Sequence, residues 1–444
     1  MTAQPQEHPL IRVREVRSLE RSAFARKLRE RSAELGTPLG TGRDGVLRWE
    51  SGRTPDNLTQ LVMADVIGID SALVESHPWP QWLQFDPLQQ PNEYPWSGPG
   101  TVGALKDVIG SPMDRRTFFL GSAAMTAALF SWLTADPVAA AQLTTGRRIG
   151  EGAVTTIERR VRELRLADDE DGGGTLIRDT AATLAAVTDL LTNRSHTLAH
   201  QRRLYAAGAD LARMRAWAAF DVHGRCDDVA FKAALQAAHA ADDPALGAHT
   251  LTFWAAASYN TGRAVEAHAL ASAALAAVRG RAAPRVEALV LARRARARSH
   301  LHDVGCWRDL DAAQTKLEAA RLDQTGEPEW AYWFDGSEYA GSLASTQLAM
   351  GRADQAEKGF ALSAREAAGT VRTQAIYLVR AADAQLQQGH VEDACATAHH
   401  ALDITAEISS QRTTGPLRDL AAALASHSHI PEAREVRERI SATI

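Results

Sequence analysis

The side chains best suited to metal or redox chemistry, histidine and cysteine, are spaced in ways that argue against a metal centre. Three histidine pairs lie one or two residues apart on predicted helices, namely His300 and His302, His399 and His400, and His427 and His429. Side chains at that spacing diverge around a helix, so no pair faces a single ion. The cysteines are far apart and in no CxxC arrangement: Cys226, Cys306 and Cys395. We therefore expect no metal site and no disulfide framework, which fits a reducing cytoplasm.

Familiar catalytic motifs are also missing. The sequence has no GxxxxGK[ST] phosphate loop, no GxGxxG after a predicted strand, no GxSxG elbow and no HExxH pair. The sequence therefore predicts a protein that is not an enzyme and that uses no cofactor.

Arginine side chains that could bind an anionic partner occur in the stretch GTGRDGVLRWESGRTPD near the N-terminus. Its apolar positions predict a helix over 41–50 with Val46 and Trp49 on the buried side. Gly52 and Pro55 then end that helix.

The elements around this stretch position it within a small helical domain. Amphipathic helices are predicted over 12–17 and 22–35, and one or two closing helices over 58–67. The apolar positions of the first two helices are Leu10, Val13, Val16, Phe24, Leu28 and Leu35. This order, with the Trp-Glu-x-Gly-Arg-x-Pro phrase at 49–55, resembles the phage-repressor type (XRE-like) of helix-turn-helix transcriptional regulator.

The resemblance implies a DNA-binding domain over residues 1–76, with the third helix in the major groove of a double-stranded DNA operator. The residues that it implies for DNA binding are Arg21, Thr41, Arg43, Asp44, Leu47, Arg48 and Arg53. Arg43 and Arg48 would each donate a bidentate pair to guanine or hold a phosphate, and Thr41 would cap the helix while touching a phosphate.

Three residues depart from the family pattern and leave the activity open. Gly45 weakens the third helix by roughly 1 kcal/mol relative to alanine. Leu47 offers only an apolar contact to a thymine methyl group, and Glu20 would repel a phosphate. The alternative is a domain that keeps the fold but binds DNA weakly or uses its surface for protein contacts.

Residues 148–444 are rich in Ala, Leu and Arg, and glycines mark an internal repeat. The repeat glycines, each followed by Arg or His, are Gly224, Gly262, Gly351 and Gly389. Residues at matching offsets are mostly small: Val229, Ala267, Ala356 and Ala394; Gln236, Ala274, Ser363 and Ala401; and Trp217, Ala255, Ala344 and Ala382. Two helices joined by a glycine turn pack closely when the residues at their crossing are small. The pattern resembles the tetratricopeptide repeat.

We count five to six repeats over roughly 200–442, with the helices between about 148 and 200 as an N-terminal cap. A weaker unit around Gly305 has Arg298, Leu310 and Leu317 at the small positions, and a terminal unit lies around Ser428 and Ala433. The expected fold is all-α: an N-terminal helix-turn-helix domain, a linker and a C-terminal tetratricopeptide-like α-solenoid. The alternative is an Ala-rich helical bundle without true repeats.

The acidic and glycine-rich run over 168–174 is predicted to be a solvated loop, and a cation site there is the alternative. Residues 77–147 are predicted to be a Pro/Trp-rich linker and an apolar connecting helix. We expect Trp79, Trp82 and Trp96 to pack this linker onto one of the two domains, rather than to form an aromatic ligand cage.

Within that linker, Arg115 and Arg116 precede an apolar run, as in a twin-arginine export signal. Such a signal acts at an N-terminus, and the run over 117–135 is mostly Ala, Gly, Ser and Thr, which favour membrane insertion little. We therefore expect a buried connecting helix, with an uncleaved membrane anchor as the less favoured alternative.

With a net charge of −5, DNA binding must be confined to one module. The whole chain resembles two-part regulators, among them peptide-responsive quorum regulators, in which a repeat domain senses a signal and controls a helix-turn-helix homodimer. This resemblance implies a groove that binds a peptide or small molecule. The candidate groove residues are Arg213, Trp217, Trp254, Tyr259, Asn260, Tyr332, Trp333, Tyr339 and Tyr377. The alternative is a protein-interaction scaffold with a degenerate helix-turn-helix.

Overall fold

The computed structural model describes residues 8–16, 19–67, 69, 71–85, 94–110, 125–126, 128–129, 131–132, 148–171, 173–367, 371–405 and 411–443. The regular secondary structure of these residues is helical, with turns between the helices, no β-strand, and one isolated bridge between Arg148 and Ser195. The all-helical prediction is therefore confirmed. The chain divides into two compact units, Met1–Glu93 and Tyr94–Ile444.

Unit 1 is a small helical bundle with its own core. Its elements are α1 (Pro9–Val16), α2 (Arg21–Glu34), α3 (Arg43–Glu50), α4 (Asn57–Ile67), α5 (Ser71–Ser76) and the 3-10 helix η1 (Gln81–Phe85). Leu10, Val13, Phe24, Leu28 and Val46 are fully buried in this core, and Trp49 is buried beside them. Leu35, predicted on the apolar face of the second helix, is 47% exposed, because α2 ends one residue earlier and the chain turns there.

A buried carboxylate ties the first three helices of unit 1 together. Glu50, at the end of α3, accepts hydrogen bonds from Arg14 of α1 and Arg21 of α2, and the donor–acceptor distance is 2.5 Å in each. The Glu50 and Arg14 side chains are buried, whereas Arg21 remains about one-third exposed. Charge-assisted hydrogen bonds of this kind are about twice as strong as neutral ones. The last turn of α3 is thereby fixed on α1 and α2.

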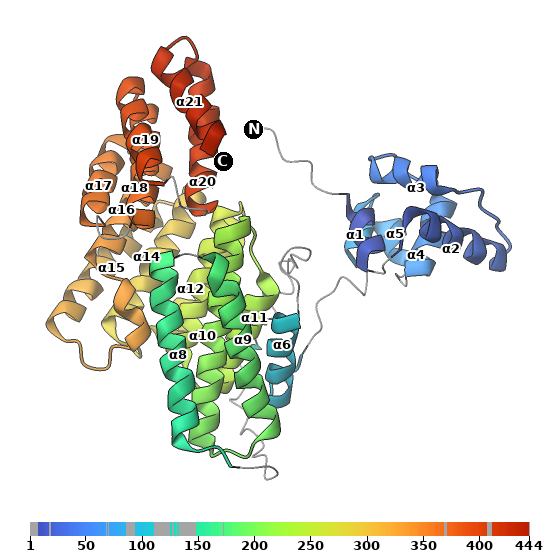
Figure 1. The fold of residues 1–444 in the computed structure, drawn as a ribbon, viewed down its shortest axis with the longest axis horizontal. Coiled ribbons are helices and arrows are strands. Elements are labelled where there is room, and N and C mark those ends of the chain that lie inside the picture. Colours follow the sequence, from blue (N-terminus) through green and yellow to red (C-terminus); the bar gives the residue numbers. More distant parts are fainter. Residues whose placement is uncertain are drawn as a thin grey trace. The chain divides into compact units, whose positions relative to one another are not determined.

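Unit 2 is a series of helix pairs (Figure 1). It begins with α6 (Gly98–Gly110) and the long helices α8 (Glu151–Asp171) and α9 (Gly173–Asn193). The pairs that follow are α10 (Leu198–His223) with α11 (Asp228–Ala240), α12 (Pro244–Asn260) with α13 (Ala264–Val278), α14 (Pro284–His300) with α15 (Gly305–Leu322), α16 (Gly336–Ala349) with α17 (Ala353–Glu366), α18 (Val371–Gln387) with α19 (Val391–Thr405), and α20 (Gln411–Ala423) with α21 (Pro431–Thr443). Two 3-10 helices, η2 (Glu329–Trp333) and η3 (Leu424–His427), interrupt the series.

The predicted glycine turns are present in unit 2. Gly224, Gly262, Gly351 and Gly389 each follow the first helix of a pair, with φ of 64°, 81°, 76° and 82°. Such left-handed backbone is accessible to glycine without the steric cost of a Cβ. The alanines at the predicted helix crossings are fully buried: Ala255, Ala267, Ala274, Ala344, Ala356, Ala382, Ala394 and Ala401.

The unit around Gly305 turns differently from the prediction. Gly305 is the first residue of α15, and His302 adopts the left-handed backbone at φ 53° instead. Arg298 fits at the crossing because it forms ion pairs with Asp303 and Asp309. The large Arg298 side chain is thus accommodated at the helix crossing by its ion pairs, where most of the other repeat units have a small residue.

The predicted loop over 168–174 is wrong. Helix α8 continues to Asp171 and α9 begins at Gly173. Packing explains the difference, because Val161 and Leu164 of α8 are buried in the core of unit 2 and hold the helix against α10. Among the described residues, no group of acidic, histidine or cysteine side chains could hold a metal ion.

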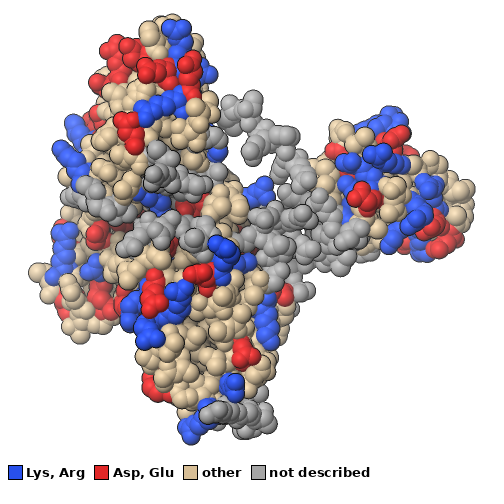
Figure 2. Space-filling model, in the orientation of Figure 1, with Lys and Arg blue, Asp and Glu red and all other residues tan. Residues whose placement is uncertain are grey.

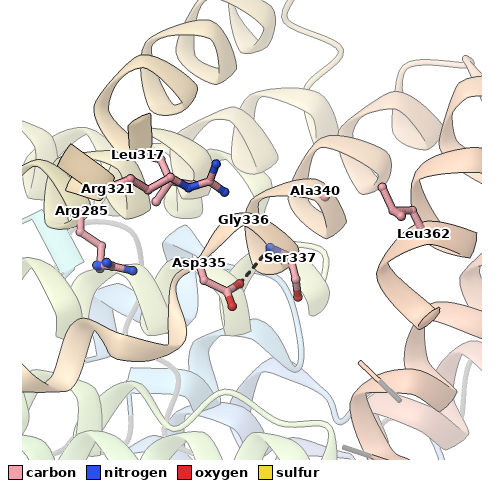
Figure 3. A pocket seen from close by; sticks show the side chains of 8 residues that line it. All are labelled: Arg285, Leu317, Arg321, Asp335, Gly336, Ser337, Ala340 and Leu362. Carbon is pink, nitrogen blue, oxygen red and sulfur yellow. Dashed lines mark hydrogen bonds between the residues drawn. The ribbon is translucent and has the colours of Figure 1, made fainter. Parts of the chain in front are cut away.

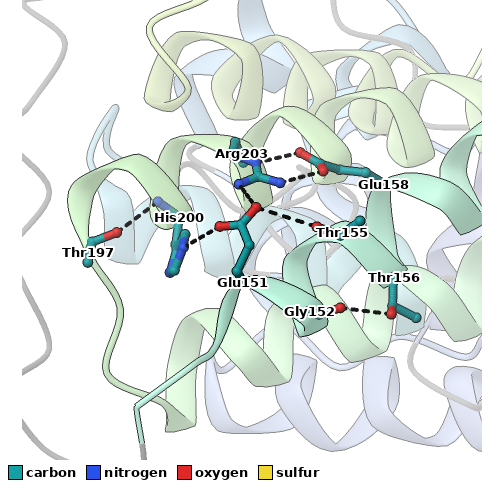
Figure 4. A network of polar contacts seen from close by, with 8 residues as sticks. All are labelled: Glu151, Gly152, Thr155, Thr156, Glu158, Thr197, His200 and Arg203. Carbon is teal, nitrogen blue, oxygen red and sulfur yellow. Dashed lines mark hydrogen bonds and ion pairs between the residues drawn. The ribbon is translucent and has the colours of Figure 1, made fainter.

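An ion-pair network near the surface also fastens α8 to α10 (Figure 4). Arg203 of α10 lies 2.6 Å from both Glu151 and Glu158 of α8, and His200 Nε2 lies 2.9 Å from Glu151. Hydrogen bonding to Arg203 lowers the pKa of Glu151. Because Glu151 is exposed and Arg203 is only half-buried, the network orients α8 more than it stabilises the fold.

The first helices of successive pairs pack side by side in one layer, and the last of them contacts the first. Helices α10, α12, α14 and α16 pack in order, and α20 packs on both α18 and α10. Arg372 of α18 donates to the Asp221 carboxylate of α10 over 3.3 Å and to the Asp168 carbonyl of α8 over 2.6 Å. The array therefore closes on its own first helices, and the inner faces of these helices are largely buried.

The range predicted as a linker contributes to both units. Trp79, just before η1, and Trp82, within it, pack on the core of unit 1, whereas Trp96 packs edge-on against His239 in unit 2. The tryptophans therefore pack onto folded helices as predicted, but onto both units rather than one. Most of the apolar run over 117–135 lies outside the described residues. Of its described part, Trp132 is buried in unit 2, so close to Gly247 that a Cβ there would be 2.7 Å from the indole.

No helix in the described part of the chain is long and apolar enough to cross a membrane.

Candidate nucleic-acid interface and ligand surface

Helix α3 has one buried and one exposed face. Val46 and Trp49 point into the core of unit 1, while the DNA-binding candidates on the other face are exposed: Arg43, Asp44, Leu47, Arg48 and, just beyond the helix, Arg53. In the part of the chain that the structure describes, Arg43, Arg48 and Arg53 form no ion pair. Their guanidinium groups are thus available to an anionic partner.

The start of α3 differs from the prediction. The N-cap is Gly42, and no side chain caps the helix, so the capping role predicted for Thr41 is wrong. The Thr41 carbonyl instead accepts a hydrogen bond from Arg29 of α2 over 2.5 Å. Since the first backbone N–H groups of α3 have no side-chain cap, they remain available to a phosphate, which a helix N-terminus binds well.

Gly45 has a packing role that the sequence did not reveal. It is buried, and a Cβ at this position would lie 3.2 Å from the Thr41 methyl group. Leu47 is 44% exposed on the outward face, between the arginines in the sequence. The structure thus gives the two unusual residues of α3 different surroundings. Gly45 leaves room for the Thr41 methyl group, and Leu47 presents an apolar side chain to solvent.

Arg21 is less available than predicted, because Glu50 holds its Nε atom. Glu20, the N-cap of α2, is exposed and makes no capping hydrogen bond. Acidic side chains lie among the basic ones on the visible face of unit 1 (Figure 2). The basic groups on α3 are therefore local features and not part of a wholly basic face.

The candidate groove residues separate into several environments in unit 2. Trp254 and Tyr339 serve the packing between helices: the Trp254 indole donates to Asp228 over 2.6 Å, and the Tyr339 hydroxyl donates to the Leu310 carbonyl over 3.1 Å. Asn260 is exposed at the end of α12 and donates to the Ala256 carbonyl. These side chains are already engaged with their own fold.

Two tyrosines lie on the inner layer of helices. The Tyr259 ring stacks on His300, with centroids 5.0 Å apart, and lies under the Arg296 guanidinium. The Tyr377 hydroxyl donates to Glu338 over 3.3 Å, and its ring lies so close to Gly341 that any side chain there would collide. Both rings are buried and join neighbouring first helices.

Of the remaining candidates, Arg213, Trp217 and Trp333 meet in one aromatic cluster. We use the term "aromatic patch" for the inner-layer side chains Arg213, Trp217, His249, Phe253 and Arg293. The Phe253 ring lies 4.9 Å from Trp217 and 5.1 Å from His249, and the Arg213 guanidinium lies 4.4 Å above it. Trp333 of η2 packs on this patch, whereas Tyr332 is 43% exposed.

Sequence reasoning missed His249, Phe253 and Arg293 in this patch, and Trp330 of η2 that covers it. The signal that could have found them is the EWAYW segment, which interrupts the repeat spacing between Gly305 and Gly351. A tryptophan-rich insertion in an otherwise Ala-rich array needs an aromatic surface on which to pack.

A separate pocket of about 580 Å³ lies where α16 begins (Figure 3). Its lining comprises Arg285, Leu317, Arg321, Asp335, Gly336, Ser337, Ala340 and Leu362. Asp335 caps α16 by accepting from the N–H groups of Ser337 and Glu338, and Arg285 pairs with Glu327 over 2.7 Å. The polar groups at this helix start are thus largely satisfied internally, and no predicted ligand residue lines the pocket.

Comparison of the chain with protein-family models gives no match, and comparison with curated proteins gives none either.

Proposed function

We propose that the protein is a DNA-binding transcriptional regulator of the helix-turn-helix, XRE-like type whose tetratricopeptide-like array senses a peptide or small molecule. The observation that carries the proposal is the exposed face of α3. Arg43, Arg48 and Arg53 lie there without ion pairs to other described residues, while the opposite face is fixed by Trp49 and by the Glu50 ion pairs. A rigid helix with free guanidinium groups is suited to the major groove.

The uncapped start of α3 supports the same role. Its backbone N–H groups and helix dipole favour a phosphate oxygen near Gly42, and Arg43 adds a charge next to it. Leu47 contributes an apolar contact that suits a thymine methyl group. Together these groups provide both phosphate positioning and limited base recognition.

The array is proposed to act as the sensing and dimerising part of this regulator. Support comes from its inner layer, where arginines and aromatic rings are concentrated on α10, α12 and α14. Such side chains are enriched at binding hot spots. A ligand that changes the closure of the array would change the spacing of two α3 helices in a homodimer, which must match half-sites one helical turn apart.

Selection from a pool of random DNA duplexes tests the proposal and requires no defined operator sequence. The full chain is expected to enrich one sequence, and Arg43→Ala is expected to abolish the enrichment. The matched control is Arg434→Ala, which removes an exposed arginine from α21. Failure of the unaltered protein to retain any duplex at low salt contradicts the proposal.

The second candidate function is a protein-interaction scaffold whose helix-turn-helix domain no longer binds DNA. It is favoured by the exposure of Leu47 and Leu58 on unit 1, since apolar side chains suit a protein partner. Under this alternative the selection enriches nothing, and Leu47→Ala weakens capture of a protein partner.

A further inference from the structure

The connection between α15 and α16 differs from the other connections between successive pairs. Residues from Asp323 to Asp335 form it, whereas only Ala241 to Asp243 separate α11 from α12. The extra residues bring η2, with the sequence Glu-Trp-Ala-Tyr-Trp, onto the inner layer of helices. This segment is therefore an insertion that occupies the inside of the array.

Two carboxylates fasten the insertion to the array. Glu327 pairs with Arg285 of α14 over 2.7 Å, and both side chains are mostly buried. Glu329 pairs with Arg162 of α8 through both carboxylate oxygens, and both side chains of this pair are about half exposed. Exposed pairs contribute little net stability, so the Glu329 contact orients η2 and is easily exchanged.

The tryptophans of η2 cover the aromatic patch. Trp330 stacks on His249 with ring centroids 4.0 Å apart and planes 14° apart. Trp333 meets Phe253 edge-on at 5.4 Å and lies beneath the Arg293 guanidinium at 5.5 Å. Stacked and cation–π contacts of this kind recognise aromatic side chains with defined geometry.

The fit of η2 on this patch is incomplete. His249 is 1% exposed, and neither of its ring nitrogens has a hydrogen-bond partner among the described residues. Burying a polar group without a partner is unfavourable. The resident segment therefore leaves the buried imidazole without hydrogen bonds, which weakens its hold on the patch.

We propose that the aromatic patch is a binding surface for a peptide in which tryptophan follows an acidic residue, and that η2 is the internal segment that competes for it. This inference rests on the sensing role of the array in the proposed function and names its ligand class. The acidic residue takes the place of Glu329 at Arg162, and the tryptophan takes the place of Trp330 on His249.

Fluorescence anisotropy with a labelled peptide of sequence EPEWAYWF, copied from residues 327–334, tests the proposal. A tethered segment has an effective concentration in the millimolar range, so the unaltered protein is expected to bind the peptide weakly. The Trp330→Ala, Trp333→Ala double variant is expected to bind it at least tenfold more tightly. The control peptide EPEAAYAF is expected to show no gain. Equal binding of both peptides, or no gain in the double variant, overturns the proposal.

A second variant keeps the test decisive if the double variant does not fold. Glu329→Arg breaks only the exposed pair with Arg162 and leaves both tryptophans in place. It is expected to increase peptide affinity at least threefold, and Arg162→Glu in the same chain is expected to reverse the increase. An unchanged affinity in Glu329→Arg contradicts the proposal.

DNA retention measured on the same variants separates this inference from the proposed function. Loss of peptide binding with DNA retention intact removes only the inference. Peptide binding without DNA retention by any variant supports the surface and removes the DNA-reading role.

Discussion

Arg372 of α18 and Asp221 of α10 form a buried ion pair, 3.3 Å apart, between helices far apart in the sequence. Since Arg372 also donates to the Asp168 carbonyl of α8, one guanidinium joins a late helix of the array to two early ones. This contact closes the array and buries its inner layer. It also means that a ligand on the inner layer must compete with contacts already made within the protein.

The first prediction concerns that ion pair. Arg372→Ala is expected to lower the free energy of unfolding by about 3–5 kcal/mol, because it removes a charge partner from the buried Asp221 carboxylate. Arg372→Met with Asp221→Leu is expected to lose less, since it removes both charges of this pair together. Chemical denaturation measures both. As a matched control, Arg439→Ala removes an arginine from the exposed pair with Asp403 and is expected to cost about 1 kcal/mol or less. Equal losses at the two arginines would contradict the closing role.

The second prediction concerns Glu50. Glu50→Gln removes the charge that holds Arg14 and Arg21, and is expected to destabilise unit 1 by about 2–4 kcal/mol because Arg14 stays buried. Glu34→Gln, which alters an exposed pair with Arg31, serves as the control and is expected to change little. Thermal melting of the full chain, with the protection of unit 1 followed by amide hydrogen exchange, gives the measurement. A melting temperature unaffected by Glu50→Gln contradicts the account.

The third prediction concerns Gly45. Helix propensity alone favours Gly45→Ala by about 1 kcal/mol. The Cβ would lie 3.2 Å from the Thr41 methyl group, so we expect the single substitution to be nearly neutral. In a Thr41→Ser background, Gly45→Ala is expected to recover about 1 kcal/mol. A double-mutant cycle by chemical denaturation measures the coupling. Full stabilisation by the single substitution would show that Thr41 does not restrict this site.

The fourth prediction concerns pH. Burial, and then the nearby Arg213, hold the pKa of His249 well below its ordinary value, although Asp210 acts in the opposite direction. Because the unfolded chain binds this proton more readily, stability is present above the unfolded pKa of about 6.5 and is lost as pH falls below it. His249→Phe keeps a ring on Trp330 and is expected to reduce the loss of unfolding free energy between about pH 7.5 and 5.5. Burial lowers the pKa of His300 as well, so part of the pH dependence remains. An unchanged pH dependence in His249→Phe contradicts this assignment.

Several parts of the fold were predictable because local chemistry determines them. Glycines with left-handed backbone end the first helices of the pairs, and the alanines at matching offsets allow the close crossings of α12 with α13 and α18 with α19. The buried face of α3 followed from Val46 and Trp49. These features depend on neighbours in the sequence, which periodicity reveals.

The rest depends on contacts between residues far apart in the sequence. No pattern indicated that Arg372 reaches Asp221, that Arg21 pairs with Glu50, or that Trp330 stacks on His249. Trp254 and Tyr339 illustrate the same limit, since aromatic side chains on first helices suit a groove and a core equally well. Their partners on α11 and α15 decide where they lie.

The affinity of the full chain for its selected duplex, measured across a series of salt concentrations, tests the central claim most directly. The account predicts specific binding that weakens steeply as salt rises, because phosphate contacts release counterions. Arg43→Ala and Arg48→Ala are each expected to cost roughly 1–3 kcal/mol of binding free energy, while Arg434→Ala changes nothing. The same affinity for selected and scrambled duplexes, or equal affinities for the α3 variants and the unaltered protein, would contradict the claim that α3 reads DNA.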